Sequence, residues 1–87
     1  ILVVEPNHTF VLKDHQNAKS VYVLGTFNSW AEPGYSMQKT EFGWMISLHL
    51  NRGKTLYKFI VDGKWILDPD NSFWEDNGLD TGNSVLW

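Results

Sequence analysis

A tryptophan and a lysine on one predicted hairpin offer the most distinctive chemistry in this sequence of 87 residues. Asp62-Gly63 is a strong signal for a two-residue turn between antiparallel strands. Such a turn pairs Ile60 with Trp65 and places Lys58 on the same, outward face. An indole stacks on the C–H face of a pyranose at little conformational cost, and an ammonium donates hydrogen bonds to hydroxyls. The pair suits sugar binding; the alternative is that Trp65 is only a cross-strand partner of Ile60, covered by a loop.

The elements that position this pair are expected to be strands. Apolar and polar residues alternate with period two, and no segment keeps helical spacing for more than a turn. The face of the hairpin opposite Trp65 is the more apolar one, with Tyr57, Phe59, Val61 and Ile66, and should face the core. We therefore expect an all-β fold, an Ig-like (early-set) antiparallel β-sandwich of about seven short strands. The predicted strands include residues 9–12, 21–24, 43–50, 56–62 and 84–87.

Length, charge and composition exclude several classes of function. The chain has room for one domain, which we expect to span residues 1–87 and, because it does not start with Met, to be excised from a larger protein. The absence of Cys excludes a disulfide framework and a thiol nucleophile. A net charge of −3 gives no basic surface for nucleic acid or anionic lipid, so neither partner is expected. Five Trp, five Phe and three Tyr exceed the needs of one small core and favour a binding surface.

Three segments resemble a known family. Residues 21–30, VYVLGTFNSW, resemble the "strand, Gly-x-Phe-Asn-x-Trp" segment of the family-48 carbohydrate-binding modules, which include the glycogen-binding domain of AMP-activated protein kinase. Residues 57–65, followed by Asp68-Pro69, resemble the second family signature, and residues 83–85 resemble the closing strand. The order and spacing agree with the family from about residue 9 to residue 87.

This resemblance implies a site for α-glucan, meaning glycogen, starch or malto-oligosaccharide. Two tryptophans would stack on glucose rings, a lysine, a threonine and an asparagine would bind hydroxyls, and a leucine would reach over the chain. The module would be non-catalytic, with no cofactor and no metal, and would tether linked or associated domains of its parent protein to the polysaccharide. The implied carbohydrate-binding residues are Trp30, Lys58, Trp65, Leu79, Thr81 and Asn83.

Two other classes of function remain to be weighed. The first is an Ig-like interaction or scaffold domain packed on an enzyme with no sugar bound, which predicts that Trp30 and Trp65 are buried or covered. The second is a glycosidase that uses two of the late carboxylates, but a chain this short has little room for a catalytic cleft. The pattern Asp68-x-Asp70-x-Ser72 begins like a calcium loop and then lacks its glycine and its closing glutamate. No catalytic residue is expected.

Other aromatic and turn residues receive structural roles. Trp44 lies in the apolar register of its strand and is expected in the core, as is Phe27. Asn28 is expected to shape the turn before Trp30. The role of Trp74 stays open among three alternatives: it extends the sugar platform, packs against a neighbouring domain or covers the core.

Overall fold

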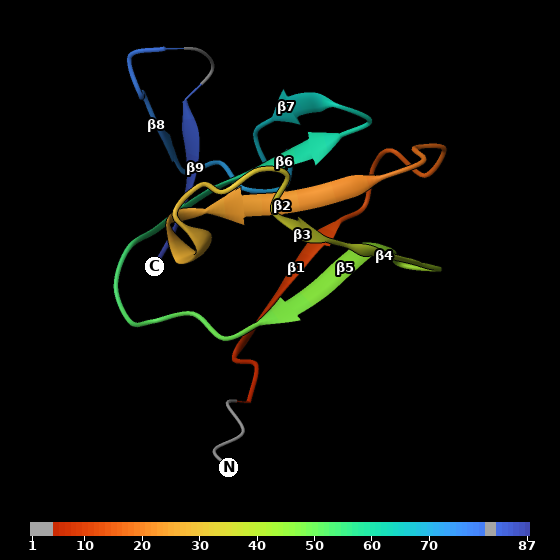
Figure 1. Ribbon diagram of the computed structural model, residues 1–87, viewed down its shortest axis with the longest axis horizontal. Coiled ribbons are helices and arrows are strands. Elements are labelled where there is room, and N and C mark those ends of the chain that lie inside the picture. Colours follow the sequence, from red (N-terminus) through yellow and green to blue (C-terminus); the bar gives the residue numbers. More distant parts are fainter. Residues whose placement is uncertain (1–4, 80–81) are drawn as a thin grey trace.

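The computed structural model describes residues 5–79 and 82–87 and is an antiparallel β-sandwich, which confirms the predicted fold class (Figure 1). The first sheet has the strand order β1–β5–β4. Its strands are β1 (His8–Leu12), β4 (Gln38–Thr40) and β5 (Gly43–Leu48). Within the described residues, no helix has the length and hydropathy needed to cross a membrane.

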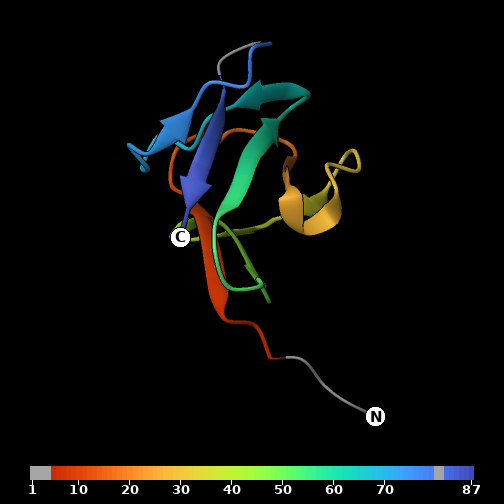
Figure 2. The ribbon, with the colours of Figure 1, turned by 90° about the vertical axis from the view of Figure 1, so that its left-hand side faces the viewer.

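The second sheet has the order β3–β2–β6–β9–β8, and β7 also pairs with β6. Because β2 occupies one edge of β6, β7 and β9 share the other edge and lie end to end along it. Figure 2 shows β9 (dark blue) alongside β6 (green), with the short 3-10 helix η1 (Thr26–Asn28) on the other side. The strands of this sheet are β2 (Val21–Gly25), β3 (Tyr35–Ser36), β6 (Thr55–Val61), β7 (Lys64–Ile66), β8 (Trp74–Glu75) and β9 (Asn83–Leu86).

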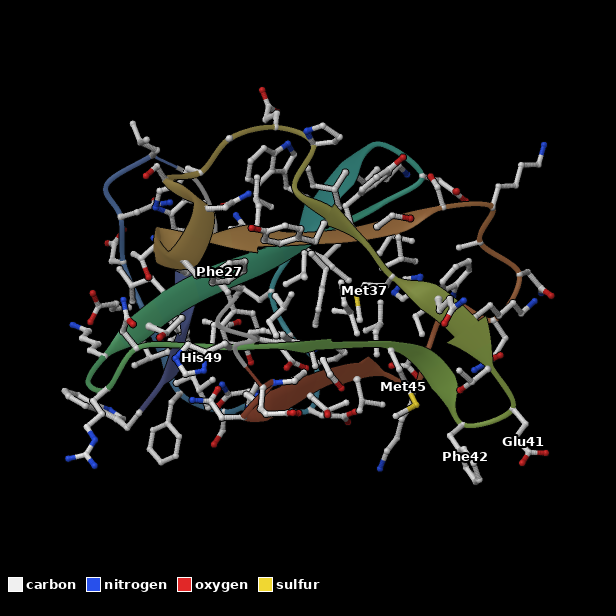
Figure 3. All side chains as sticks on the ribbon, turned by 60° about the horizontal axis from the view of Figure 1, so that its bottom comes forward. Phe27, Met37, Glu41, Phe42, Met45 and His49 are labelled. Carbon is white, nitrogen blue, oxygen red and sulfur yellow. The ribbon has the colours of Figure 1, made fainter. Side chains whose placement is uncertain are left out.

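The core lies between the two sheets and is built from alternate residues of their strands. Trp44 is buried there, as predicted, and its indole nitrogen donates a hydrogen bond to the carbonyl of His15 at 3.1 Å. Phe27 packs against the same core, and Figure 3 shows it with Met37 between the two layers. The buried cluster consists of Phe10, Leu12, Val21, Val23, Met37, Trp44, Leu50, Tyr57, Phe59 and Val61.

The β6–β7 hairpin has the register predicted from its turn. Asp62 and Gly63 both have positive φ, at 47° and 86°, as a type I′ turn requires. The Asp62 carboxylate also accepts hydrogen bonds from the backbone amides of Lys19 and Ser20, at 2.8 and 3.0 Å, which fixes the hairpin against the loop before β2. The paired residues are Phe59 with Ile66, Ile60 with Trp65, and Val61 with Lys64.

Candidate carbohydrate-binding site

Trp65 and Lys58 lie together on the outward face of the second sheet. Trp65 is 38% exposed, and its cross-strand partner Ile60 is buried. The ammonium nitrogen of Lys58 lies 5.8 Å from the centre of the Trp65 ring, within the range of a cation–π interaction. The predicted face is therefore right, but Lys58 is only 2% exposed, so its side chain is enclosed rather than open to solvent as the outward register suggested.

Trp30 is presented by a tightly bonded turn after β2. The Asn28 side chain accepts a hydrogen bond from the Gly25 amide and donates one to the Ala31 carbonyl, both at 3.1 Å. The Trp30 amide donates to the Gly25 carbonyl at 2.9 Å. Ser29 and Trp30 have φ values of 56° and 58°, a left-handed conformation that costs about 1–2 kcal/mol for a residue with a side chain. The predicted role of Asn28 is confirmed, and Trp30 itself is half-buried.

The glycine that opens this turn is required by close packing. A Cβ atom at Gly25 would overlap the backbone carbonyl of Leu56, because Gly25 pairs with Tyr57 on the neighbouring strand. The hydroxyl of Thr26 accepts a hydrogen bond from the Leu56 amide at 3.3 Å. The turn that carries Trp30 is therefore fixed directly to β6, the strand that carries Lys58.

The third predicted segment supplies one residue to the same face. Ser84 pairs with Tyr57, which faces the core, so the preceding residue Asn83 points to the outward side, as Lys58 does. We call the outward surface formed by Lys58, Trp65 and Asn83 the Trp65 face. Leu79 is 89% exposed in the connection between β8 and β9. Thr81 lies outside the described residues.

Trp74 lies on the other side of the sheet from Trp65. It pairs with Ser84, and paired residues of antiparallel strands share a face, so Trp74 points to the side of Tyr57. Its side chain is 56% exposed. The structure thus excludes the alternative that Trp74 extends the platform made by Trp65.

A hydrogen-bonded network explains the Asp68-Pro69 signature, which the sequence alone left without a role. The Tyr57 hydroxyl donates to Asp68 at 2.7 Å and accepts from Asn71 at 3.1 Å. The second oxygen of Asp68 accepts from the Asp70 amide, and the Asp68 amide donates to the Ser84 hydroxyl, both at 2.9 Å. Burial is the main cause that raises the pKa of Tyr57 above its ordinary value. Asp68 is therefore a structural acceptor that holds the segment after β7 against β6 and β9.

An antiparallel sandwich with an exposed indole, a lysine and an asparagine on one sheet face has the architecture of a carbohydrate-binding module. In residues 5–79 and 82–87, no three His, Cys, Asp or Glu side chains come together as a metal site. Residues 8–86 match the family model described as the glycogen recognition site of AMP-activated protein kinase. The chain belongs to this family.

Relatives with this similarity are beta subunits of 5'-AMP-activated protein kinase. The chain is 37% identical over 68 residues to 5'-AMP-activated protein kinase subunit beta-1 of Rattus norvegicus, which covers 78% of this chain and 24% of the relative. It is 34% identical over 59 residues to subunit beta-2 of Homo sapiens, which covers 68% of this chain and 21% of the relative. The chain thus spans less than a quarter of the length of these two relatives.

Proposed function

We propose that this chain is a non-catalytic α-glucan-binding module in which Trp30 and Trp65 stack on glucose rings. The observation that carries the proposal is the exposed ring of Trp65 beside Lys58 on one sheet face. Neither Trp65 nor Trp30 is buried, which favours sugar binding over the scaffold alternative. A planar ring held on a strand loses little conformational entropy when a sugar stacks on it.

Polar groups beside the indole provide the hydrogen bonds that orient the sugar. Asn83 both donates and accepts, and Lys58, which is only 2% exposed, donates to a hydroxyl when its ammonium turns out of this enclosure. Leu79 is free to close over the glucan as an apolar clamp, since most of its side chain is exposed. We also assign Thr81 a hydrogen bond to a sugar hydroxyl, and the resemblance to the family is what supports this assignment.

The mechanism we infer is tethering rather than catalysis. Asp68, the first of the late carboxylates, has both oxygens engaged by hydrogen bonds, and Glu75 forms an ion pair with Lys54. Neither carboxylate is therefore poised as a free acid or base. The chain covers a small part of its relatives, so we propose that it is one module of a longer protein and that it raises the local concentration of linked domains at the polysaccharide.

Titration with maltoheptaose or β-cyclodextrin, followed by tryptophan fluorescence, tests this function. Trp65→Ala is expected to weaken binding at least about tenfold, because it removes a stacking ring. Trp74→Ala is the matched control, since it removes a more exposed tryptophan from the opposite face of the same sheet. Circular dichroism verifies that both variants are folded.

The outcomes separate the two classes of function. Saturable binding that is lost in Trp65→Ala and kept in Trp74→Ala supports the glucan site. Absence of binding by the unmodified chain at millimolar sugar, or equal losses in the two variants, contradicts it and favours the interaction scaffold.

A further inference from the structure

Glu75 lies on the Trp65 face, one strand beyond Asn83. The two residues are direct partners in the β8–β9 ladder, so their side chains leave the sheet on the same side. Neighbouring strands lie about 4.8 Å apart, which places Glu75 within one sugar-ring width of Asn83. The preceding residue, Trp74, points to the opposite side. Glu75 is thus the residue through which β8 reaches the proposed glucan site.

The backbone at Glu75 is fixed by close packing against the other arm of its hairpin. Gly82 has a φ of +92°, and a Cβ atom there would overlap the carbonyl oxygen of Glu75. The backbone of Gly82 is therefore in close contact with the Glu75 carbonyl, which fixes the register between the two sides of the hairpin. This contact sets the position of Glu75 relative to Asn83, the residue that follows Gly82.

The side chain of Glu75 is held over the sheet by an ion pair with Lys54. Lys54 lies directly before β6, which begins at Thr55, and its ammonium pairs with the Glu75 carboxylate. The Glu75 side chain is 42% exposed, so its carboxylate is oriented by Lys54 and is accessible to a ligand.

The chemistry of the carboxylate complements the other groups on this face. Lys58 can only donate hydrogen bonds, and Asn83 has a single carbonyl acceptor. Sugar hydroxyls also carry protons that need acceptors, and a carboxylate offers two oxygens with about four acceptor positions. Lys54 pairs with the Oε2 atom of Glu75, and Oε1 is the oxygen that we assign to a sugar hydroxyl. Hydrogen bonds to a charged acceptor are about twice as strong as those between neutral groups.

We propose that Glu75 is an additional contact residue of the glucan site and accepts hydrogen bonds from the hydroxyls of the sugar unit bound by Asn83. This inference rests on the proposed function, and it extends the site to a fourth strand of the sheet. Glu75 acts by direct contact, and Lys54 orients it.

Calorimetric titration of the whole chain with maltoheptaose tests the role of Glu75. Glu75→Gln keeps the shape of the side chain and removes its charge and one acceptor; we expect affinity to fall about tenfold. Glu41→Gln is the matched control, because Glu41 lies at the β4–β5 turn of the other sheet and points away from the molecule (Figure 3). Lys54→Met leaves the carboxylate in place and is expected to keep affinity within about threefold.

Three results would overturn this assignment. Equal losses in Glu75→Gln and Lys54→Met show that the ion pair only positions the hairpin. Normal binding by Glu75→Gln, together with loss in Trp65→Ala, refutes the role of Glu75 and leaves the proposed function standing. Absence of sugar binding by the unmodified chain refutes both.

Discussion

The Lys58 ammonium lies 5.8 Å from the centre of the Trp65 ring, and the lysine is enclosed while the ring is exposed. A cation this close to an indole is attracted by the negative face of the ring, most strongly where water is excluded. The enclosed lysine therefore helps to hold the ring in one orientation. The exposed surface of the ring stays available for a ligand.

Lys58→Met is expected to weaken both sugar binding and stability. Methionine keeps most of the volume of the lysine stem but removes a buried cation that contacts the Trp65 ring, and removing one partner of a buried charge interaction is destabilising. We expect the free energy of unfolding to fall by about 1–3 kcal/mol and affinity for β-cyclodextrin to fall about tenfold through loss of a donor. Urea unfolding and fluorescence titration measure the two quantities. Unchanged affinity would remove Lys58 from the proposed site.

Asn28→Ala is expected to weaken both the fold and sugar binding. The substitution leaves the buried Gly25 amide without its acceptor, which costs about 1–3 kcal/mol of unfolding free energy. It also removes the bond to Ala31 that closes the turn around Trp30, so the ring loses its fixed position. Thermal unfolding and maltoheptaose titration measure these effects.

Asn17→Ala is the control for that substitution, because Asn17 is an exposed asparagine in the loop before β2. It should change neither quantity. An Asn28→Ala variant that unfolds and binds like Asn17→Ala would show that the turn is held by its backbone bonds alone.

The parts of the site that the sequence predicts are those set by local geometry. Asp62-Gly63 admits one tight turn, so the pairing of Ile60 with Trp65 follows from two residues. The alternation pattern places Lys58 on the outward face and does not reveal its enclosure, because burial on that face depends on the rest of the fold. The sequence also does not show on which side of the sheet Trp74 lies. A two-residue strand is too short to show an alternation, and its register is set by pairing with β9.

Glu75 shows the same limit. Its place on the Trp65 face follows from pairing with Asn83, and its orientation follows from an ion pair with Lys54, 21 positions earlier in the chain. The sequence offered only a cluster of late acidic residues, which is the usual composition of a solvated loop. A charge cluster becomes a site hypothesis only when the sheet register shows which member faces the ligand.

Gly82→Ala is expected to lower the unfolding free energy by more than the backbone cost of replacing a glycine at positive φ. Gly53 and Gly82 both have positive φ, at +102° and +92°. A Cβ atom at Gly53 has nothing within 4 Å, whereas one at Gly82 overlaps the Glu75 carbonyl. Gly53→Ala should lose only the backbone term, about 1 kcal/mol, and Gly82→Ala should lose more and also bind maltoheptaose more weakly. Equal unfolding free energies in the two variants would contradict the close contact.

Tyr57→Phe is expected to destabilise the sandwich at neutral pH. The variant removes the hydroxyl that joins Asp68 and Asn71, and each lost bond is worth about 0.5–1.5 kcal/mol. Urea unfolding at pH 7 measures this loss. Sugar affinity should change less than in Lys58→Met, since Tyr57 faces the core and not the Trp65 face.

Tyr57→Phe is also expected to change how the unfolding free energy depends on pH in the alkaline range. Burial raises the pKa of Tyr57 in the folded state above its ordinary value of 10.0, so the unfolded chain loses this proton at a lower pH than the folded chain does. Between those two pKa values the folded state binds more protons, and the unfolding free energy of the wild type must fall as pH rises above about 10. Tyr57→Phe has no such proton, so its unfolding free energy should fall less steeply over pH 9–11, and the difference between the two proteins should narrow. Parallel pH profiles would show that the Tyr57 hydroxyl titrates alike in the folded and unfolded chains, because all other titrating groups are common to both proteins.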